Sequence, residues 1–248
     1  MKILFSPSES KISSQILKER TDFLSHIRIP FQKREYFLEN YLKILTQEDD
    51  EKITQLFGSK KIDLDLLKNC QKINYAQTHL AIELYNGVAY RALDFEGLDE
   101  EAKDYILQSV YIFSNLFGVV AAQDRLPFYK VNQNFKHSLL NIKSIYEAIK
   151  PELDQLLCQE EMAIDLRAEI YAKVYPLACR HIVPIFLKNG KKLSHFSKYY
   201  RGIFLRHLAL LQVKDFKKIS QLEFPLLKLI DIRKKDESEE YFYEICAE

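Results

Sequence analysis

The sequence predicts a single compact domain of the α+β class, in which helices and strands alternate irregularly. Short apolar runs with strand character are separated by longer segments whose apolar residues recur at helical spacing. These segments follow no regular β-α-β repeat, which favours a mixed α/β domain over a regular parallel sheet. Only six glycines and seven prolines occur in 248 residues, so the chain has little material for flexible linkers. We therefore expect one domain over residues 1–248.

The predicted strands are short and mostly bounded by turn residues. KILF is ended by Ser6-Pro7, because proline cannot donate a hydrogen bond to a sheet. The Asn189-Gly190 pair is the strongest hairpin signal in the chain. The last two apolar runs are separated by a charged loop and predict a terminal antiparallel hairpin. The strand segments are residues 2–5, 162–166, the run that begins at 181, and 224–245, and residues 109–120 form either a strand or a strand-turn element around Ser114-Asn115.

The predicted helices lie between these strands. Apolar residues recur at helical spacing in residues 32–71, with a break at Gly58-Ser59, and further helices are expected at 142–158, 168–174 and 194–211.

Composition excludes several classes of protein. The chain has 36 Lys and Arg against 35 Asp and Glu, and its longest apolar runs are too short to cross a bilayer. Its four cysteines and six histidines are dispersed without metal-ligand spacing, and no nucleotide-binding or hydrolase motif occurs. With no signal peptide, we expect a cytoplasmic protein without metal, cofactor or membrane contact. A monomer is favoured, although the sequence does not fix the oligomeric state.

SPSESK, residues 6–11, directly follows the first predicted strand. Strand ends are where α/β folds place polar binding groups, and this segment supplies Ser6, Ser8, Glu9 and Lys11. The alternative is a capped turn in which Ser8 or Ser10 starts a helix. Spacing alone favours the turn.

LYNGVAYRALD, residues 84–94, combines a turn with aromatic hydroxyl groups. Gly87 lets the backbone approach a ligand, while Tyr85 and Tyr90 can stack and form hydrogen bonds. A turn that leads into a core helix explains the same residues.

DLRAEIY, residues 165–171, ends another predicted strand. Asp165 and Arg167 are two residues apart, which places them on the same side of an extended chain. They form either a structural ion pair or a polar site.

HFSKYYRG, residues 195–202, concentrates charge on one side of a predicted helix. An arc of about 140° holds His195, Lys198, Arg201, Gly202 and Arg206. The opposite side holds Phe196, Ile203, Phe204, Leu208 and Leu211. Because Gly202 has no side chain, a phosphate could approach the backbone there. A phosphate contact and a solvated helix face explain this pattern equally well.

The surrounding segment is also basic. Residues 188–218 contain nine Lys or Arg and one acid, Asp215, whereas six acids and no cation occur from Asp236 to the end. A basic segment of this kind can follow a phosphate backbone.

Five motifs together resemble the peroxide stress protein YaaA family, also called UPF0246 or DUF328. They are SPSESK, YNGVAYRALD, FSNLFGVVAAQDRLPFYKV, DLRAEIY and HFSKYYRGIFLRHL, in the family's order and at roughly its spacing. The resemblance implies a bacterial, cytoplasmic, YaaA-like mixed α/β domain with a positively charged cleft. It also implies association with double-stranded DNA and with limiting damage from peroxide and iron.

The resemblance, together with the four clusters, assigns expected roles by position. The expected cleft residues are Ser6, Tyr85, Gly87, Tyr90, Asp124, Arg167 and Tyr171. The expected nucleic-acid contacts are Lys11, Arg125, Lys130, His195, Lys198, Arg201, Gly202 and Arg206. The chain departs from the family where GVVAAQD replaces G-V-L-R-P-x-D, so Ala121 and Ala122 stand for an arginine and a proline. This departure alters the cleft if that arginine belongs to it.

Two hypotheses about function follow. The first is a stress protein that binds double-stranded DNA without strong sequence preference, which fits the basic segment. The second is an enzyme for a nucleobase, nucleotide or similar small anion, with Glu9 or Asp165 as general acid or base. Its cleft would be lined by Ser6, Glu9, Asp165, Arg167 and Lys198. Direct binding of iron is a weaker third hypothesis, because the sequence has no cluster of metal ligands. Any effect on iron is then expected to be indirect.

Overall fold

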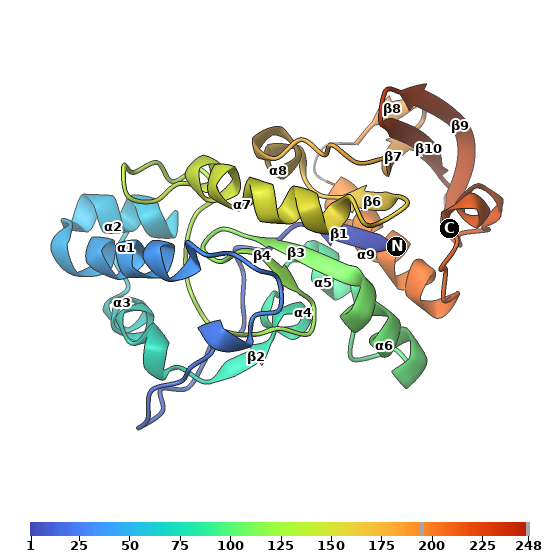
Figure 1. The fold of residues 1–248 in the computed structure, drawn as a ribbon. Helices are drawn as coiled ribbons and strands as arrows, with labels where there is room; N and C mark the ends of the chain where they lie inside the picture. The colour runs from blue at the N-terminus through green and yellow to red at the C-terminus, as the bar shows by residue number, and fades with distance from the viewer. Residues whose placement is uncertain (194–195, 247–248) are drawn as a thin grey trace.

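A mixed sheet runs through the middle of the molecule, with parallel strands at its centre (Figure 1). The computed structural model describes residues 1–193 and 196–246. In these residues the strand order is β4-β3-β1-β6-β7-β10-β9, and β8 pairs with β7. The inner strands are parallel, whereas β4, β8 and β9 are antiparallel to their neighbours. The strands are β1 (Lys2–Phe5), β3 (Val110–Ser114), β4 (Gly118–Ala121), β6 (Ala163–Leu166), β7 (His181–Lys188), β8 (Lys191–Lys192), β9 (Leu227–Lys235) and β10 (Ser238–Ile245).

Helices cover the sheet and extend the molecule at one end. Figure 1 shows α1, α2 and α3 together at one end and the β9–β10 hairpin at the other. Side chains of Asp49, Asp63, Asp99 and Asn141 cap α2, α3, α6 and α7 by accepting backbone N–H bonds. The helices are α1 (Arg34–Gln47), α2 (Asp50–Phe57), α3 (Leu64–Gln71), α4 (Ala81–Leu84), α5 (Val88–Leu93), α6 (Glu100–Ser109), α7 (Ile142–Leu157), α8 (Glu169–Val174) and α9 (Ser197–Leu210).

Three short 3-10 helices and a separate strand pair complete the described elements. The 3-10 helices are η1 (Leu24–His26), η2 (Ile73–Tyr75) and η3 (Phe216–Gln221), and the pair is β2 (Thr78–Leu80) with β5 (Arg125–Pro127). Within residues 1–193 and 196–246, no helix combines the length and the apolar character needed to cross a membrane.

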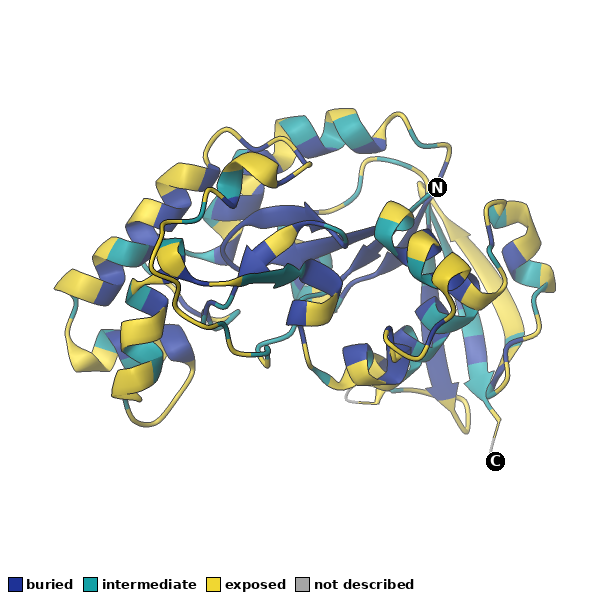
Figure 2. Cartoon of the chain, turned by 90° about the horizontal axis from the view of Figure 1, so that it is seen from below, coloured by how far each residue is buried: buried dark blue, intermediate teal, exposed yellow. Residues whose placement is uncertain are grey.

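Continuous apolar sequence explains the inner strands. Every residue of β3 and β6 is buried, as in parallel sheets that are covered on both faces. In Figure 1, α7 crosses in front of the sheet, while α5 and α9 lie behind it. Figure 2 shows that buried residues gather in the central strands and on the helix sides next to them.

The mixed α/β fold class and the predicted hairpins are confirmed. Asn189 and Gly190 join β7 to β8 with φ values of 53° and 70°, as a tight hairpin turn requires. The last two apolar runs form the antiparallel pair β9–β10. The parallel pairing at the centre of the sheet is a finding that the sequence did not indicate, because parallel partners are far apart in the chain.

One local expectation about the N-terminal motif is wrong. No helix begins at Ser8 or Ser10, and residues 6–11 instead form a loop after β1. An isolated antiparallel bridge joins Lys11 to Tyr85 at the end of this loop. The backbone therefore turns toward α5 rather than into a helix of its own.

The limits of α9 also differ from the expectation of 194–211. The helix begins at Ser197, so Phe196 precedes it and is 70% exposed instead of facing the core. Phe204 and Leu208 are buried, but Leu211 lies past the last turn and is exposed. The predicted start at Ser194 and the expected contact His195 lie outside the described residues.

Candidate functional site

A pocket of about 600 Å³ opens where β1 and β6 end side by side. After β1, the next strand of this sheet is β3, which lies beside β1 on the side away from β6. After β6 the chain continues to β7, which lies on the side away from β1. Connections that leave adjacent parallel strands in opposite directions open a crevice at the carboxyl ends, the usual ligand position in α/β sheets. The loops after both strands line this pocket, together with parts of α5 and α9.

Ser6 ties these loops together. Its hydroxyl accepts the Ala168 N–H at 2.6 Å, and its carbonyl accepts the Tyr90 hydroxyl at 2.8 Å. Gly87 lies against the same loop, where an added Cβ would be 2.3 Å from the Ser8 Oγ atom. Ser6, Gly87 and Tyr90 all line the pocket, and their contacts fix its width.

Among the residues that the structure describes, three cations line the pocket. Arg91 comes from α5, and Lys198 and Arg201 come from the first turns of α9. Burial lowers the pKa of Arg201, while the nearby Asp165 carboxylate acts in the opposite direction. An arginine stays charged at neutral pH even so. The two helices therefore give the pocket a positive wall.

Among the described residues that line the pocket, Glu9 alone is acidic. Its carboxylate has neither an ion pair nor a hydrogen bond within residues 1–193 and 196–246. Its charge is nevertheless felt nearby: burial lowers the pKa of Lys11 and raises that of Tyr171, and the Glu9 carboxylate partly offsets the first shift and adds to the second. An ionised carboxylate is an acceptor only, so Glu9 is available to N–H or O–H donors of a ligand.

Asp165 and Arg167 form a buried ion pair outside the wall of the pocket. The guanidinium Nε and Nη2 donate to the two carboxylate oxygens at 2.8 and 2.7 Å, and Nη1 donates to the Tyr175 carbonyl at 2.9 Å. Burial raises the pKa of Asp165, but the charge and hydrogen bonds of Arg167 outweigh it and hold the pKa below its ordinary value. Because both oxygens are engaged, the geometry gives Asp165 a structural role and leaves Glu9 as the free carboxylate.

Hydroxyl groups form a connected layer next to the pocket. Tyr85 and Tyr129 share a hydrogen bond of 2.9 Å, and Tyr129 shares another of 2.8 Å with Ser114. Tyr171, which lines the pocket, donates to Asn115 at 2.7 Å. Burial raises the pKa of Tyr129 to about 12, so its hydroxyl stays protonated at neutral pH. The layer holds the aromatic rings in fixed positions.

Lys11 lies behind the pocket loop, between two of these rings. Its ammonium is 4.2 Å from the centre of the Tyr129 ring and 5.2 Å from that of Tyr85, and it donates to the Ser8 carbonyl at 2.8 Å. Burial lowers the pKa of Lys11 to about 7, and the charge of Lys130 acts in the same direction. Lys11 therefore loses much of its charge just above neutral pH.

The stability of the protein should depend on pH through Lys11. The unfolded chain binds this proton up to about pH 10.4, whereas the folded protein releases it near 7, so stability rises with pH between these values. We expect the unfolding free energy of wild type, relative to Lys11→Met, to rise by about 1–3 kcal/mol from pH 6.5 to 9.5. Urea unfolding at both pH values measures this difference, and the variant cancels the contribution of other groups. A constant difference would contradict the lowered pKa.

The expectation that Gly202 exposes backbone to a phosphate is wrong. Gly202 is buried against α5, where an added Cβ would lie 2.1 Å from the Ala89 carbonyl oxygen. Arg206, one turn further, donates to the carbonyls of Leu93 and Asp94 at 2.7 Å each and so holds the end of α5. Both residues serve the packing of α9 on α5.

Several other expected site residues lie away from the pocket wall. Asp124 is buried and accepts the N–H groups of Ala121 and Arg28, and burial raises its pKa. Arg125 is exposed on β5 and donates to the Thr78 carbonyl at 2.9 Å. Lys130 is close enough to lower the pKa of Lys11 but does not line the pocket. Ala121 and Ala122, which replace the family's arginine and proline, are buried and are also outside it.

The pocket residues that the sequence analysis did not assign to the site include Arg91, Gln133 and Phe5. Arg91 lies within the YNGVAYRALD motif, four residues after Gly87, and residues at that spacing share one side of a helix. That spacing could have identified it. Gln133 comes from an irregular segment, and no pattern in the sequence marks it. Across residues 1–193 and 196–246, no group of His, Cys, Asp or Glu side chains is arranged to hold a metal ion.

Known proteins similar to this chain cover nearly all of it. A family model described as peroxide stress protein YaaA matches residues 1–229. An uncharacterized protein of Campylobacter jejuni is 39% identical over 247 residues, which cover 99% of both chains. A UPF0246 protein of Streptomyces coelicolor is 30% identical over 84% of this chain and 82% of its own. A UPF0246 protein of Fusobacterium nucleatum is 25% identical over 90% and 91%.

Proposed function

Because this chain belongs to the peroxide stress protein YaaA family, we propose that it protects DNA during peroxide stress by binding the duplex without strong sequence preference. The observation that carries this proposal is the positive wall formed by Arg91, Lys198 and Arg201 in a chain of almost neutral net charge. Cations gathered at one place attract a phosphate backbone regardless of base sequence. Of the phosphate contacts expected on α9, this proposal retains Lys198 and Arg201. It leaves out Gly202 and Arg206, which do not line the pocket, and adds Arg91.

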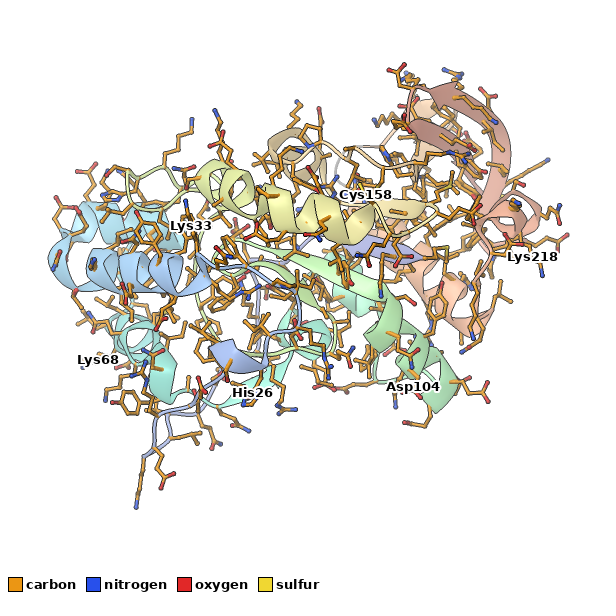
Figure 3. All side chains as sticks on the ribbon, viewed as in Figure 1. His26, Lys33, Lys68, Asp104, Cys158 and Lys218 are labelled. Atoms are coloured by element: carbon orange, nitrogen blue, oxygen red, sulfur yellow. The ribbon has the colours of Figure 1, made fainter. Side chains whose placement is uncertain are left out.

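Further cations flank α9 in the sequence. The hydrogen bond and charge of Lys173 lower the pKa of Glu169 on α8, and the charge of Lys192 acts in the same direction, so Lys192 lies near α8. Lys214, Lys217 and Lys218 follow the other end of α9, where Figure 3 shows Lys218, and Lys214 lines a separate pocket with Met1 and Lys2 at the start of β1. A bound duplex would keep iron-generated oxidants away from the covered bases, which is how we propose that the protein limits iron-dependent damage without holding iron itself.

The salt dependence of duplex binding tests this proposal. Each phosphate contact contributes about 0.9 to the slope of log affinity against log salt concentration. We expect Lys198→Ala with Arg201→Ala to reduce that slope by about 1.8, because two contacts are removed. Fluorescence anisotropy with a labelled duplex of mixed sequence, between about 50 and 200 mM salt, measures the slope.

A matched control removes the same charge elsewhere. Lys143 on α7 and Lys234 on β9 are 74% and 77% exposed and lie outside the pocket. Their replacement by alanine should leave the slope almost unchanged. If both double variants lose the same slope, binding follows net charge rather than this surface, and the proposed site is wrong.

A further inference from the structure

We propose that the pocket holds one nucleotide, with its phosphate on the cations of α5 and α9 and its base against Glu9. The inference concerns the inside of the pocket and uses the same three cations as the proposed binding of duplex backbone at its rim. Three features carry it: the size and position of the pocket, the pairing of cations with a free carboxylate, and the aromatic residues of the wall.

The pocket has the size of a small-molecule site. Its volume of about 600 Å³ lies within the range of roughly 300–1,000 Å³ that is typical of such sites. It lies where the connections from β1 and β6 diverge, which is the position at which α/β sheets commonly bind nucleotides. One nucleotide fits a space of this size, whereas a run of duplex backbone can reach only its rim.

The charges inside the pocket require a ligand with two kinds of group. Arg91, Lys198 and Arg201 suit a phosphate, but a surface that binds only phosphate gains nothing from Glu9, because two negative charges repel each other. Glu9 has no partner among the described residues, so its carboxylate oxygens are open to donors of a ligand. A nucleobase supplies the missing donors, since carboxylates accept the amino groups of bases.

The walls suit a flat ring. Phe5, Tyr90 and Tyr171 line the pocket, and the ring of Phe5 packs edge-on against that of Tyr90 at 5.2 Å. The hydroxyls of Tyr90 and Tyr171 are already used by Ser6 and Asn115. These side chains are only 1–6% exposed, so they offer a ligand narrow apolar edges, against which the edge of a base can pack. Of the bases, guanine presents two neighbouring N–H donors, which match both oxygens of one carboxylate.

Calorimetry with guanosine monophosphate tests the inference on the full chain. We expect the nucleotide to bind at least about tenfold more tightly than inorganic phosphate and than guanosine, because each of these lacks one half of the contacts. Thymidine monophosphate, with a single N–H donor on its base, should bind more weakly than the guanine nucleotide. Equal affinity for nucleotide and inorganic phosphate would overturn the inference, because the pocket would then be an anion site only.

Glu9→Gln distinguishes this ligand from a duplex backbone, since the substitution keeps the shape and removes the charge. We expect it to weaken binding of guanosine monophosphate about tenfold and to leave unchanged or strengthen binding of paired duplex. If Glu9 has only a structural role, Glu9→Gln should weaken the binding of guanosine monophosphate and of paired duplex alike. Nucleotide binding that does not respond to Glu9→Gln would overturn the assignment of the base to Glu9.

The nucleotide has two sources, a free molecule or an unpaired residue of DNA. A duplex with one bulged guanine is compared with the same duplex fully paired. If free guanosine monophosphate binds, the ligand is a free nucleotide. If it does not bind but the bulged duplex binds more tightly than the paired one, the ligand is an unpaired residue of DNA. Absence of both overturns the inference. The proposed duplex binding fails separately, through loss of salt-dependent binding to the paired duplex.

Discussion

Replacing Arg167 by methionine is expected to destabilise the fold by about 3–5 kcal/mol, the largest effect of any single change proposed for this protein. The substitution leaves the Asp165 carboxylate buried without its counter-ion, and it removes the donor to the Tyr175 carbonyl. Methionine has a stem of similar length, so the loss of packing is small. Urea unfolding at neutral pH measures the difference.

Arg180→Met is the control for this change. Arg180 also pairs with an acid, Glu239, but it is 53% exposed, and an exposed pair contributes only about 0–1 kcal/mol. The pH dependence gives a second check. In wild type the pKa of Asp165 is depressed, so its stabilising effect is complete above the ordinary value and is lost as the pH falls through the lower folded value. In Arg167→Met burial is opposed by the charges of His181 and Arg201 but no longer by Arg167, so this pKa rises and the variant should recover stability as the pH falls toward about 4. An effect as small as that of Arg180→Met would show that the pair is not what stabilises this region.

Gly202→Ala is expected to cost about 3 kcal/mol and to abolish binding at the pocket. The added methyl group would collide with the Ala89 backbone, which is part of α5 and cannot move like a flexible side chain. Helices α5 and α9 must then separate, and they carry Arg91, Lys198 and Arg201. Thermal unfolding and duplex binding measured on the same sample test both consequences.

Gly190→Ala separates this packing effect from the general cost of replacing glycine. Gly190 has a positive φ of 70° but open space around its Cα, so only backbone strain of about 1 kcal/mol is expected. Binding should be unaffected. If Gly202→Ala also costs only about 1 kcal/mol and keeps its binding, the contact of α9 with α5 does not set the geometry of the site.

Local signals predicted the elements that depend on neighbouring residues. Asn189-Gly190 specifies its own turn, and the run of apolar residues in β6 specifies a covered strand, because both depend on a few adjacent side chains. The pairing of β1 with β3 and β6 was not predictable in this way. Those partners lie more than a hundred residues further along the chain, and no local pattern records their register.

The candidate site was predictable in part for the same reason. Glu9 and Lys198 belong to motifs with recognisable chemistry, and the fold brings both to one pocket. Gly202 was misjudged because an absent side chain can admit either a ligand or a neighbouring helix, and only the packing of α5 decides between them. Similarly, the sequence allowed Asp165 and Arg167 to be either a structural ion pair or a polar site. Their burial in the structure favours the ion pair.

The hydrogen bond between Ser6 and Ala168 has a consequence for how the protein becomes active. It joins residues 162 positions apart, and the positive wall is completed only by α9, still later in the chain. Chains emerge from the ribosome starting at the N-terminus, so a partly synthesised molecule has the Glu9 loop and Arg91 without the two cations of α9, Lys198 and Arg201. The pocket therefore forms as one of the last events of folding. Any fragment that ends before residue 197 should be inactive, however well it folds.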